Sequence, residues 1–420
     1  MKRILSIAAS LFLAMNVSAA DVVKLTVQNP LSTIRNGEMA EVAVAPIIKK
    51  LDGAKQFIVT DADGKEIPSQ VTYDGKLIFQ IGVGAKGKVV YYAKKGTPQK
   101  YENRVFGRQY PERVDDFAWE NDRVAFRAYG PALQKSGERA WGYDIWTKNT
   151  DRLVLEERYA LEKDAEFAKV CTRLRKMGYE DLATELYYAQ SYHVNHGTGM
   201  DCYKVGPTLG GGTAALLANG GKDIVYPKCY TIYEILDRGP LRFTFSLSYE
   251  KTTVEGQTFT EKRVISLDAG SQMNHAVITY EGISKAIPAA VGVIVHNENP
   301  NAFVLNDKEG FMAYEDLGDP YQYKEKFRAK LNKEFGQIYV GVVCMQKGVK
   351  MEYRQETGLP GACGHILAIA NYQPKATLDY YFGSAWSHNE SVGINSIAKW
   401  EAYLQQFAKT AHNPLKVTVK

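Results

Sequence analysis

The clearest pattern in the sequence is Leu241-Arg242-Phe243-Thr244-Phe245-Ser246-Leu247-Ser248-Tyr249, in which apolar and polar side chains alternate at every position. A period of two is typical of a β-strand that buries one face and exposes the other. Turn residues at 255–256 and 268–270 separate this stretch from the next two strand-like runs, 262–267 and 275–280. We therefore expect long antiparallel strands that are joined by short turns.

The chain beyond this stretch continues in the same way. Further runs of β-branched and aromatic residues lie at 290–295, 337–345 and 365–370. Only 163–190, with a break at Gly178, and 396–409 have the apolar spacing of helices. Residues 104–420 are therefore predicted to form an all-β, mainly antiparallel domain of two large stacked sheets with a few helices.

The N-terminal part carries shorter strand-like runs, with turn signals at 61–64 and 73–75. These runs are 22–27, 40–44, 57–60, 76–81 and 88–93. Five strands at this spacing predict a small β-sandwich domain over residues 21–100. Residues 94–103 contain Gly96, Pro98 and several charged side chains, which is typical of a linker.

The first residues have the features of a secretory signal. Lys2 and Arg3 form a basic start, residues 4–17 are mostly apolar, and Val17-Ser18-Ala19 provides a small-residue cleavage site. The apolar run is shorter than the roughly 20 residues that a membrane-spanning helix needs. We therefore expect a signal peptide over 1–19, no membrane insertion and a periplasmic or secreted protein. No cysteine lies near the cleavage site, so a lipid anchor is not expected.

The composition argues against a nucleic-acid partner and does not decide whether the protein binds sugars. The net charge of the 420-residue chain is +5 and drops to +3 without Lys2 and Arg3, so no nucleic-acid partner is expected. The 27 tyrosines and five tryptophans suit both sugar recognition and antiparallel sheets. The five cysteines show no C-x-x-C spacing, and we expect mostly free, buried thiols.

The densest polar group lies in a loop that contains Gly197 and Gly199. Its members are Tyr192, His193, His196, Asp201 and Tyr203. Histidine exchanges protons near neutral pH and tyrosine is a common partner acid, so the loop predicts a proton-transfer site in which the histidines and tyrosines are catalytic. Two histidines three residues apart and an aspartate also fit a divalent metal site, which stays open as the alternative. No other cofactor is expected.

A second group of charged residues is Glu120, Arg123 and Arg127. Continued strand alternation would place Arg123 and Arg127 on one face and Glu120 on the other. An arginine on a concave sheet can hold a carboxylate through two parallel hydrogen bonds, as the recognition of a uronic acid would require. The alternative is a structural ion pair between neighbouring strands.

Other candidates for substrate binding are dispersed along the chain. Asp144 and Trp146, with Trp141 nearby, could form an aromatic patch with one acid, or could simply pack in a sheet. His296 ends an apolar run, and Trp386 precedes the C-terminal helix, where a tryptophan could stack on a sugar. No phosphate-binding loop or G-x-S-x-G motif is found, which argues against nucleotide binding and a serine hydrolase.

Five segments together resemble the protein family called domain of unknown function 4861. They are FAWENDRVAFRAYGP (117–131), GYDIW (142–146), YHVNHGTGMD (192–201), YKVG (203–206) and YYFGSAW (380–386). The family occurs in polysaccharide-utilisation gene clusters of gut and marine bacteria, often beside hydrolases of unsaturated uronides. The resemblance covers nearly the whole mature chain. It implies a galactose-mutarotase-like supersandwich behind a small β-domain and a role in glycan breakdown.

The resemblance also implies eliminative or dehydrating chemistry on uronic-acid ends. Asn195 and Thr198 depart from the family pattern, in which acidic residues often stand at these positions. If those carboxylates are functional in relatives, the activity here is altered.

Three functions therefore stay open on the sequence alone. The first is a lyase or dehydratase that abstracts the C5 proton of a uronic-acid-bearing oligosaccharide. The second is a glycoside hydrolase with two carboxylates drawn from Glu120, Asp122, Asp144 and Asp201. The third is a glycan-binding protein without catalysis that uses Trp141, Trp146 and Trp386 as platforms. Fold alone does not choose among them.

Overall fold

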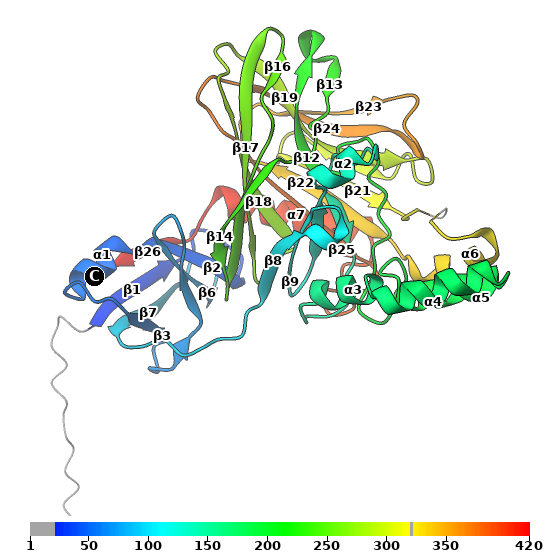
Figure 1. Cartoon of the computed structure of the whole chain (residues 1–420). Coiled ribbons are helices and arrows are strands. Elements are labelled where there is room, and N and C mark those ends of the chain that lie inside the picture. The colour runs from blue at the N-terminus through cyan, green and yellow to red at the C-terminus, as the bar shows by residue number, and fades with distance from the viewer. Residues whose placement is uncertain (1–21, 320–321) are drawn as a thin grey trace, which may run out of the picture.

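The computed structural model describes residues 22–319 and 322–420. The expected signal peptide, 1–19, lies outside the described residues. A small body at the N-terminus adjoins a larger body of sheets, and the hairpin of α4 (Ala165–Lys176) and α5 (Glu180–Gln190) projects from the larger one (Figure 1). No helix among the described residues is long and apolar enough to span a membrane.

The small body consists of two sheets with a core of their own. The first sheet has the order β26 (Lys416–Val419), β1 (Val22–Gln28), β7 (Lys88–Lys95), β3 (Phe57–Thr60) and β4 (Glu66–Ile67). The second has the order β2 (Arg35–Ala43), β6 (Lys76–Val83) and β5 (Ser69–Val71), and α1 (Ala45–Lys50) follows β2. The five strand-like runs of this region correspond to β1, β2, β3, β6 and β7.

The last strand of the chain returns to the small body. β26 pairs antiparallel with β1, with Leu25 opposite Val419. The prediction of one domain over residues 104–420 differs here from the structure, which places Lys416–Val419 in the N-terminal sheet. β26 is only four residues long and follows α7, so its alternation of apolar and polar residues is too short to indicate that it pairs with β1.

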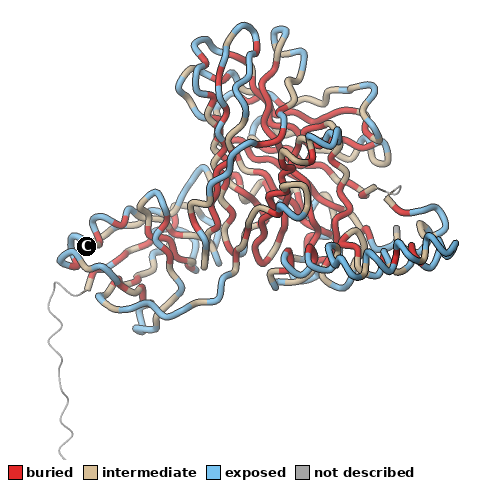
Figure 2. The backbone as a smooth tube through the Cα atoms, in the orientation of Figure 1, coloured by how far each residue is buried: buried red, intermediate tan, exposed pale blue. Residues whose placement is uncertain are grey.

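Two large antiparallel sheets pack against each other in the second body. The nine-stranded sheet has the order β14 (Ile232–Arg238), β15 (Arg242–Ser248), β17 (Gln257–Asp268), β18 (Met273–Glu281), β25 (Leu378–Trp386), β22 (Ile338–Cys344), β21 (Phe311–Asp316) and β20 (Phe303–Asn306), and β16 (Thr252–Val254) pairs with β17. The five-stranded sheet has the order β13 (Asp223–Val225), β12 (Gly211–Ala218), β19 (Ile287–His296), β24 (Ala362–Tyr372) and β23 (Lys350–Gln355). Buried residues concentrate where these sheets meet (Figure 2).

The alternating stretch that began the sequence analysis is β15. Phe243, Phe245 and Leu247 are buried, and the strand pairs antiparallel with β14 and β17 over its whole length. The prediction of a mainly antiparallel β-protein with few helices is therefore confirmed.

The helices are partly as expected. Residues 163–190 form α4 and α5 with a break at Gly178, and residues 396–409 lie in α7 (Ile397–His412), which packs against β21 and β22. The structure adds helices that the sequence analysis missed. They are α1, α2 (Pro131–Lys135), α3 (Leu155–Glu162), α6 (Glu325–Leu331) and the 3-10 turns η1 (Pro111–Arg113), η2 (Asn219–Gly221) and η3 (Asn332–Glu334).

A smaller sheet carries the charged residues of interest. Its order is β11 (Asp144–Trp146), β10 (Ala125–Ala128), β9 (Asp116–Asn121) and β8 (Val105–Tyr110). One face, which includes Phe117 and Trp119, packs into the main core. The other face packs against α3 and Tyr192 through a cluster that includes Ala118, Ala125 and Trp146.

Candidate functional site

Arg127 gathers three carboxylates on the α3-facing side of the four-stranded sheet. It lies opposite Asp144 in the register of β10 and β11, and its Nη2 is 2.5 Å from Asp144 Oδ2. The same nitrogen donates to Asp201 Oδ2 at 2.9 Å and to the Tyr129 hydroxyl at 3.2 Å. Asp116, the diagonal neighbour on β9, lies 3.5 Å from Arg127 Nη1. Arg127, Asp116, Asp144 and Asp201 are hereafter the Arg127 cluster.

The predicted facing of Arg127 was wrong, because the strand does not continue through Asn121. The chain reverses at 121–124 into β10, so that Glu120 pairs with Ala125 and Arg127 with Ala118. Cross-strand partners share a face, which puts Arg127 on the side of Glu120 and not on that of Asn121. Asn121 Oδ1 closes this turn by accepting from the backbone amides of Arg123 and Val124.

Burial dominates the electrostatics of the Arg127 cluster. The side chains of Arg127, Asp144 and Asp201 are 4%, 0% and 3% exposed. Burial, followed by repulsion from Asp201, raises the pKa of Asp144 to about 7, and burial likewise raises the pKa of Asp201 to about 6. Because three buried carboxylates share one guanidinium, their mutual repulsion favours a state in which one of the carboxyl groups keeps its proton. Arg127 is therefore enclosed by protein carboxylates, and the predicted role of holding a substrate carboxylate does not fit its position.

His193 is the partly exposed member of the predicted loop that contacts the Arg127 cluster. Its side chain is 32% exposed, and its Nδ1 lies 3.1 Å from the Asp201 carbonyl oxygen and 3.6 Å from Asp201 Oδ2. Burial and the charge of Arg127 lower the pKa of His193, so its neutral form prevails near neutral pH. Two acceptors near Nδ1 favour the proton on that nitrogen and leave the lone pair on Nε2.

The loop that carries His193 is fixed against β11. Gly199 has a φ of +103°, and a Cβ there would lie 2.1 Å from the Thr147 carbonyl oxygen, so only glycine fits this approach. Asn195 Oδ1 accepts from the amides of Gly197 and Gly199, at 2.9 and 3.1 Å. Asn195, one of the two departures from the family pattern, thus shapes the loop itself.

Tyr192 connects the loop to a second arginine. Its ring lies beside Trp146 with 4.6 Å between centroids, and its hydroxyl accepts from Arg113 Nε at 3.1 Å. Its backbone amide donates to Glu162 Oε2 at 3.2 Å. Arg113 is half-buried, and no acceptor in the described ranges bonds its Nη1 or Nη2. Arg113 is thus a cation beside the Tyr192 hydroxyl with two free donor groups.

A pocket of about 230 Å³ adjoins this region between α4, α5 and the end of α3. Its lining includes Glu162, Phe167, Cys171, Arg175, Tyr187 and Gln190. Glu162 belongs to both places, since it lines the pocket and accepts from the amide of Tyr192. The helices themselves are largely exposed (Figure 2).

Glu120 has a structural role and lies outside the site. Its Oε1 accepts from the amides of Val154 and Leu155 at 2.7 and 2.8 Å, at the N-terminus of α3. Its Oε2 accepts from Lys148 Nζ at 2.6 Å, in an ion pair that is buried on both sides. A carboxylate with these partners is committed to holding α3 on the sheet.

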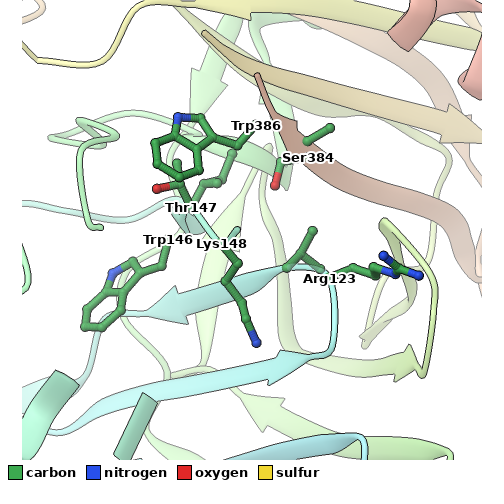
Figure 3. Close-up of a pocket in the computed structure, with 9 residues that line it drawn as sticks. Arg123, Trp146, Thr147, Lys148, Ser384 and Trp386 are labelled. Carbon is green, nitrogen blue, oxygen red and sulfur yellow. The ribbon is translucent and has the colours of Figure 1, made fainter. Parts of the chain in front are cut away.

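Arg123 and Trp386 line a different and very small pocket of about 10 Å³, which has room for about one water molecule. Thr147, Lys148, Ser384 and Trp146 are among its other lining residues (Figure 3). Arg123 donates to Ser391 Oγ at 3.3 Å. Trp386 is buried and its indole donates to the Phe335 carbonyl, while Trp146 is buried and donates to Asp144 Oδ2 at 3.1 Å. Neither tryptophan offers a free ring face, so the predicted stacking role fits neither.

The remaining predicted residues lie apart from His193. His196 is exposed and its Nε2 faces the Ser191 carbonyl oxygen at 3.0 Å. Tyr203 is buried beside His296, and its hydroxyl has no hydrogen-bond partner in the described part of the chain. His296 is also buried, with Nδ1 at 2.8 Å from Asp316 Oδ1 and Nε2 at 2.8 Å from the Lys204 carbonyl oxygen. Both of its ring nitrogens are occupied, which removes it from substrate contact.

The described residues show no set of ligands for the divalent metal site that was the alternative to proton transfer. Among residues 22–319 and 322–420, no group of three His, Cys, Asp or Glu side chains is arranged to hold a metal ion. The five cysteines form no disulfide, and all except the half-buried Cys363 are buried.

Sequence reasoning missed Asp116, Tyr129 and Arg113. Asp116 starts β9 and Tyr129 follows β10, so both belong to the same hairpin as Arg127. Had the chain reversal at 121–124 been recognised, the hairpin register would have placed Asp116 diagonally across from Arg127. Arg113 lies in a short 3-10 turn whose position against Tyr192 depends on tertiary packing.

Comparisons with solved structures give distant likenesses. One is to an alpha-mannosidase from Enterococcus faecalis V583, with a TM-score of 0.46 and 9% identity over 95% of this chain and 46% of that one. Another is to a protein in the glycosyl hydrolase family 38 from Enterococcus faecalis, with a TM-score of 0.49 and 9% identity over 95% of this chain and 47% of that one. The chain thus spans about half the length of these two structures.

A sequence relative covers almost the full length. "Uncharacterized protein P7" of Formosa agariphila is 26% identical over 415 residues, which make up 94% of this chain and 93% of that protein. The profile of the family described as Domain of unknown function (DUF4861) matches residues 27–417. Because this match includes nearly all of the chain, as the five resembling segments had indicated, the protein belongs to the DUF4861 family.

Proposed function

We propose that this chain is an exported enzyme of polysaccharide breakdown that removes the C5 proton of a uronic-acid-bearing oligosaccharide. The observation that carries the proposal is the geometry of His193. Its Nδ1 faces the Asp201 carbonyl oxygen at 3.1 Å and the Asp201 carboxylate at 3.6 Å, and its Nε2 has no partner among the described residues. A neutral imidazole that is oriented by a carboxylate and exposed at its second nitrogen is suited to act as a general base.

Arg113 takes the role that the sequence had given to Arg127. A C5 proton becomes acidic only when the neighbouring carboxylate is neutralised, and a guanidinium with two free nitrogens can do this. Nη1 and Nη2 of Arg113 are not bonded by any described acceptor, whereas Arg127 is enclosed by Asp116, Asp144 and Asp201.

Tyr192 is the proposed general acid. Its hydroxyl accepts from Arg113 Nε and donates to no acceptor in the described part of the chain, but the residue is only 3% exposed, so proton transfer requires the loop to shift when the substrate binds. In the elimination, the C5 proton passes to His193 Nε2, and the C5–H electrons form the C4–C5 double bond. The C4–O bond breaks, and the leaving oxygen takes the Tyr192 proton.

A hydrolase with paired carboxylates finds less support. Asp144 and Asp201, the two closest candidates, share one guanidinium nitrogen and are almost fully buried. Such carboxylates must flank a scissile bond with room for a sugar between them. Glu120 is committed to Lys148 and the start of α3.

Two parts of the proposal concern fold and location. The stacked nine-stranded and five-stranded sheets support a galactose-mutarotase-like supersandwich, which the family resemblance implies. The features of residues 1–19 support export to the periplasm or beyond.

The decisive experiment incubates the pure protein with a panel of uronate oligosaccharides. The proposal expects a rise in ultraviolet absorbance from an unsaturated uronide. Mass analysis then separates cleavage by elimination, which adds no water, from dehydration, which removes one. Products that have gained water and lack this absorbance would contradict the proposal in favour of hydrolysis.

A further inference from the structure

One aromatic pair lies on the surface apart from the Arg127 cluster. Of the five tryptophans, Trp119, Trp146, Trp386 and Trp400 are buried and Trp141 alone is half-exposed. Its ring lies 5.3 Å from that of the half-exposed Tyr226, at an interplanar angle of 36°. Two half-exposed aromatic rings in contact provide an apolar platform with a polar edge.

A carboxylate is fixed at the edge of this platform. Glu356 Oε2 accepts from the Tyr226 hydroxyl at 2.5 Å, and Glu356 Oε1 lies 2.9 Å from His365 Nδ1. His365 is fully buried, and its Nε2 accepts from the Leu209 amide at 3.2 Å, which leaves the ring proton on Nδ1 to donate to Glu356. Burial alone would raise the pKa of Glu356, but the hydrogen bonds from His365 and Tyr226 outweigh it and lower this pKa. Glu356 is therefore an ionised acceptor held in one orientation.

The platform is also fixed from behind. A Cβ on Gly142 would lie 2.2 Å from the Leu209 carbonyl carbon, so the backbone beside Trp141 packs directly on the segment that bonds His365. The Trp141 amide donates to the Gly206 carbonyl at 3.4 Å. Preorganised aromatic and acceptor groups lose little conformational freedom when a ligand binds.

From this geometry we propose that Trp141, Tyr226 and Glu356 form a binding subsite for a neutral sugar ring. The apolar face of the sugar stacks on Trp141, and its hydroxyls donate to Glu356. A neutral unit is favoured because the nearby guanidinium of Arg354 is already engaged by Glu352 at 2.7 Å and by the Lys222 carbonyl at 2.9 Å. An acidic sugar would meet the charge of Glu356 without a free counter-ion from Arg354.

The subsite is separate from His193. Segments 141–146 and 201–206 run side by side, with Trp141 bonded to Gly206 at one end and Trp146 bridged to Asp201 at the other. Five residues of extended chain span about 16 Å, which is the distance along these segments from Trp141 to the bridge between Trp146 and Asp201, the residue that His193 contacts. Binding at Trp141 therefore needs none of the chemistry proposed for His193.

The test uses tryptophan fluorescence of the full-length mature protein, because Trp141 is the half-exposed indole. The probes are the neutral hexasaccharides of glucose, mannose, galactose and xylose, with hexagalacturonate as the acidic arm. We expect saturable quenching by at least one neutral probe and weaker or no quenching by hexagalacturonate. No saturable quenching by any neutral probe, or tighter binding of hexagalacturonate, would overturn the proposal.

Variants then locate the binding, with affinity measured by calorimetry because the indole is removed. Trp141→Ala and Trp141→Leu should both bind the neutral probe about tenfold more weakly, and Glu356→Gln should also weaken binding. Tyr73→Ala, which removes an aromatic side chain that is 53% exposed on the small body, is the matched control and should bind as the unaltered protein does. Trp141→Leu keeps apolar volume if the alanine variant folds poorly. Unchanged affinity in a folded Trp141 variant would contradict the assignment.

Discussion

Arg127 on β10 and Asp144 on β11 are cross-strand partners, and Nη2 of Arg127 lies 2.5 Å from Oδ2 of Asp144 in a fully buried setting. The pair shares its guanidinium with Asp201, which in turn lies beside His193. His193 is therefore the partly exposed side chain that contacts this buried cluster. In this account the cluster positions His193, while His193 itself contacts the substrate.

The first prediction concerns the stability that Arg127 supplies. Arg127→Leu would leave three buried carboxylates without their cation, so we expect the free energy of unfolding to fall by about 3–5 kcal/mol. Urea unfolding measures this change. Arg152→Leu is the control, because its side chain is 64% exposed in a pair with Glu157, and it should cost under about 1 kcal/mol. Equal losses in the two variants would argue against an essential cluster.

The second prediction concerns pH. The folded-state pKa of Asp144 is about 7, raised by burial and Asp201 above its ordinary value of 3.8. The folded state therefore binds more protons than the unfolded state, and this contribution to stability is lost as pH rises from about 4 through about 7. Asp144→Asn removes the contribution. Its free energy of unfolding minus that of the unaltered protein should increase as pH rises across this range, because only the unaltered protein loses this stability. A constant or opposite difference would contradict the raised pKa.

The third prediction concerns the linker. Residues 97–100 are exposed and lie outside helices and strands, so limited trypsin digestion should cut first near Lys100. The fragments should nevertheless stay together in native size-exclusion chromatography, because β26 pairs with β1 and Gln70 Oε1 accepts from the Leu241 and Arg242 amides. Fragments that separate without denaturant, or first cuts inside the large sheets, would refute this arrangement.

The fourth prediction concerns recognition of the uronate. Arg113→Lys keeps the charge and loses the paired donors, so it should raise the KM for uronate oligosaccharides by about tenfold or more. Arg108→Lys is the matched control, since the Arg108 guanidinium is already engaged by Glu112 and Glu156. An equal change of KM in Arg113→Lys and Arg108→Lys would contradict the assignment of Arg113 to the substrate-binding site.

The sequence predicted the regular part of this fold well, because local pattern and packing agree there. The alternation of β15 reflects a strand with buried Phe243, Phe245 and Leu247, and the helical spacing of 163–190 reflects two real helices. The partner of β26 was beyond reach, since it lies almost the whole chain length away at β1. Local pattern carries no information about such pairings.

The site was predicted in part. Proximity in sequence grouped Tyr192, His193 and Asp201, and the structure places them together and brings the separately predicted Asp144 and Arg127 beside them. Burial could not be foreseen, and it removes Trp146, Trp386 and His296 from the surface. The structural role of Glu120 could not be foreseen either, because the backbone amides at the start of α3 that it binds are distant in sequence.

The most direct measurement compares His193→Ala with His275→Ala on a uronate oligosaccharide that the unaltered protein converts. His275 is a matched control, because its side chain is 37% exposed and its Nε2 lies 2.8 Å from Asp379 on the neighbouring strand of the nine-stranded sheet, away from the loop of His193. We expect His193→Ala to lower kcat by about 10²- to 10⁴-fold with a nearly unchanged Tm, and His275→Ala to retain its activity. Full turnover by a folded His193→Ala protein would contradict the assignment of His193 as the base.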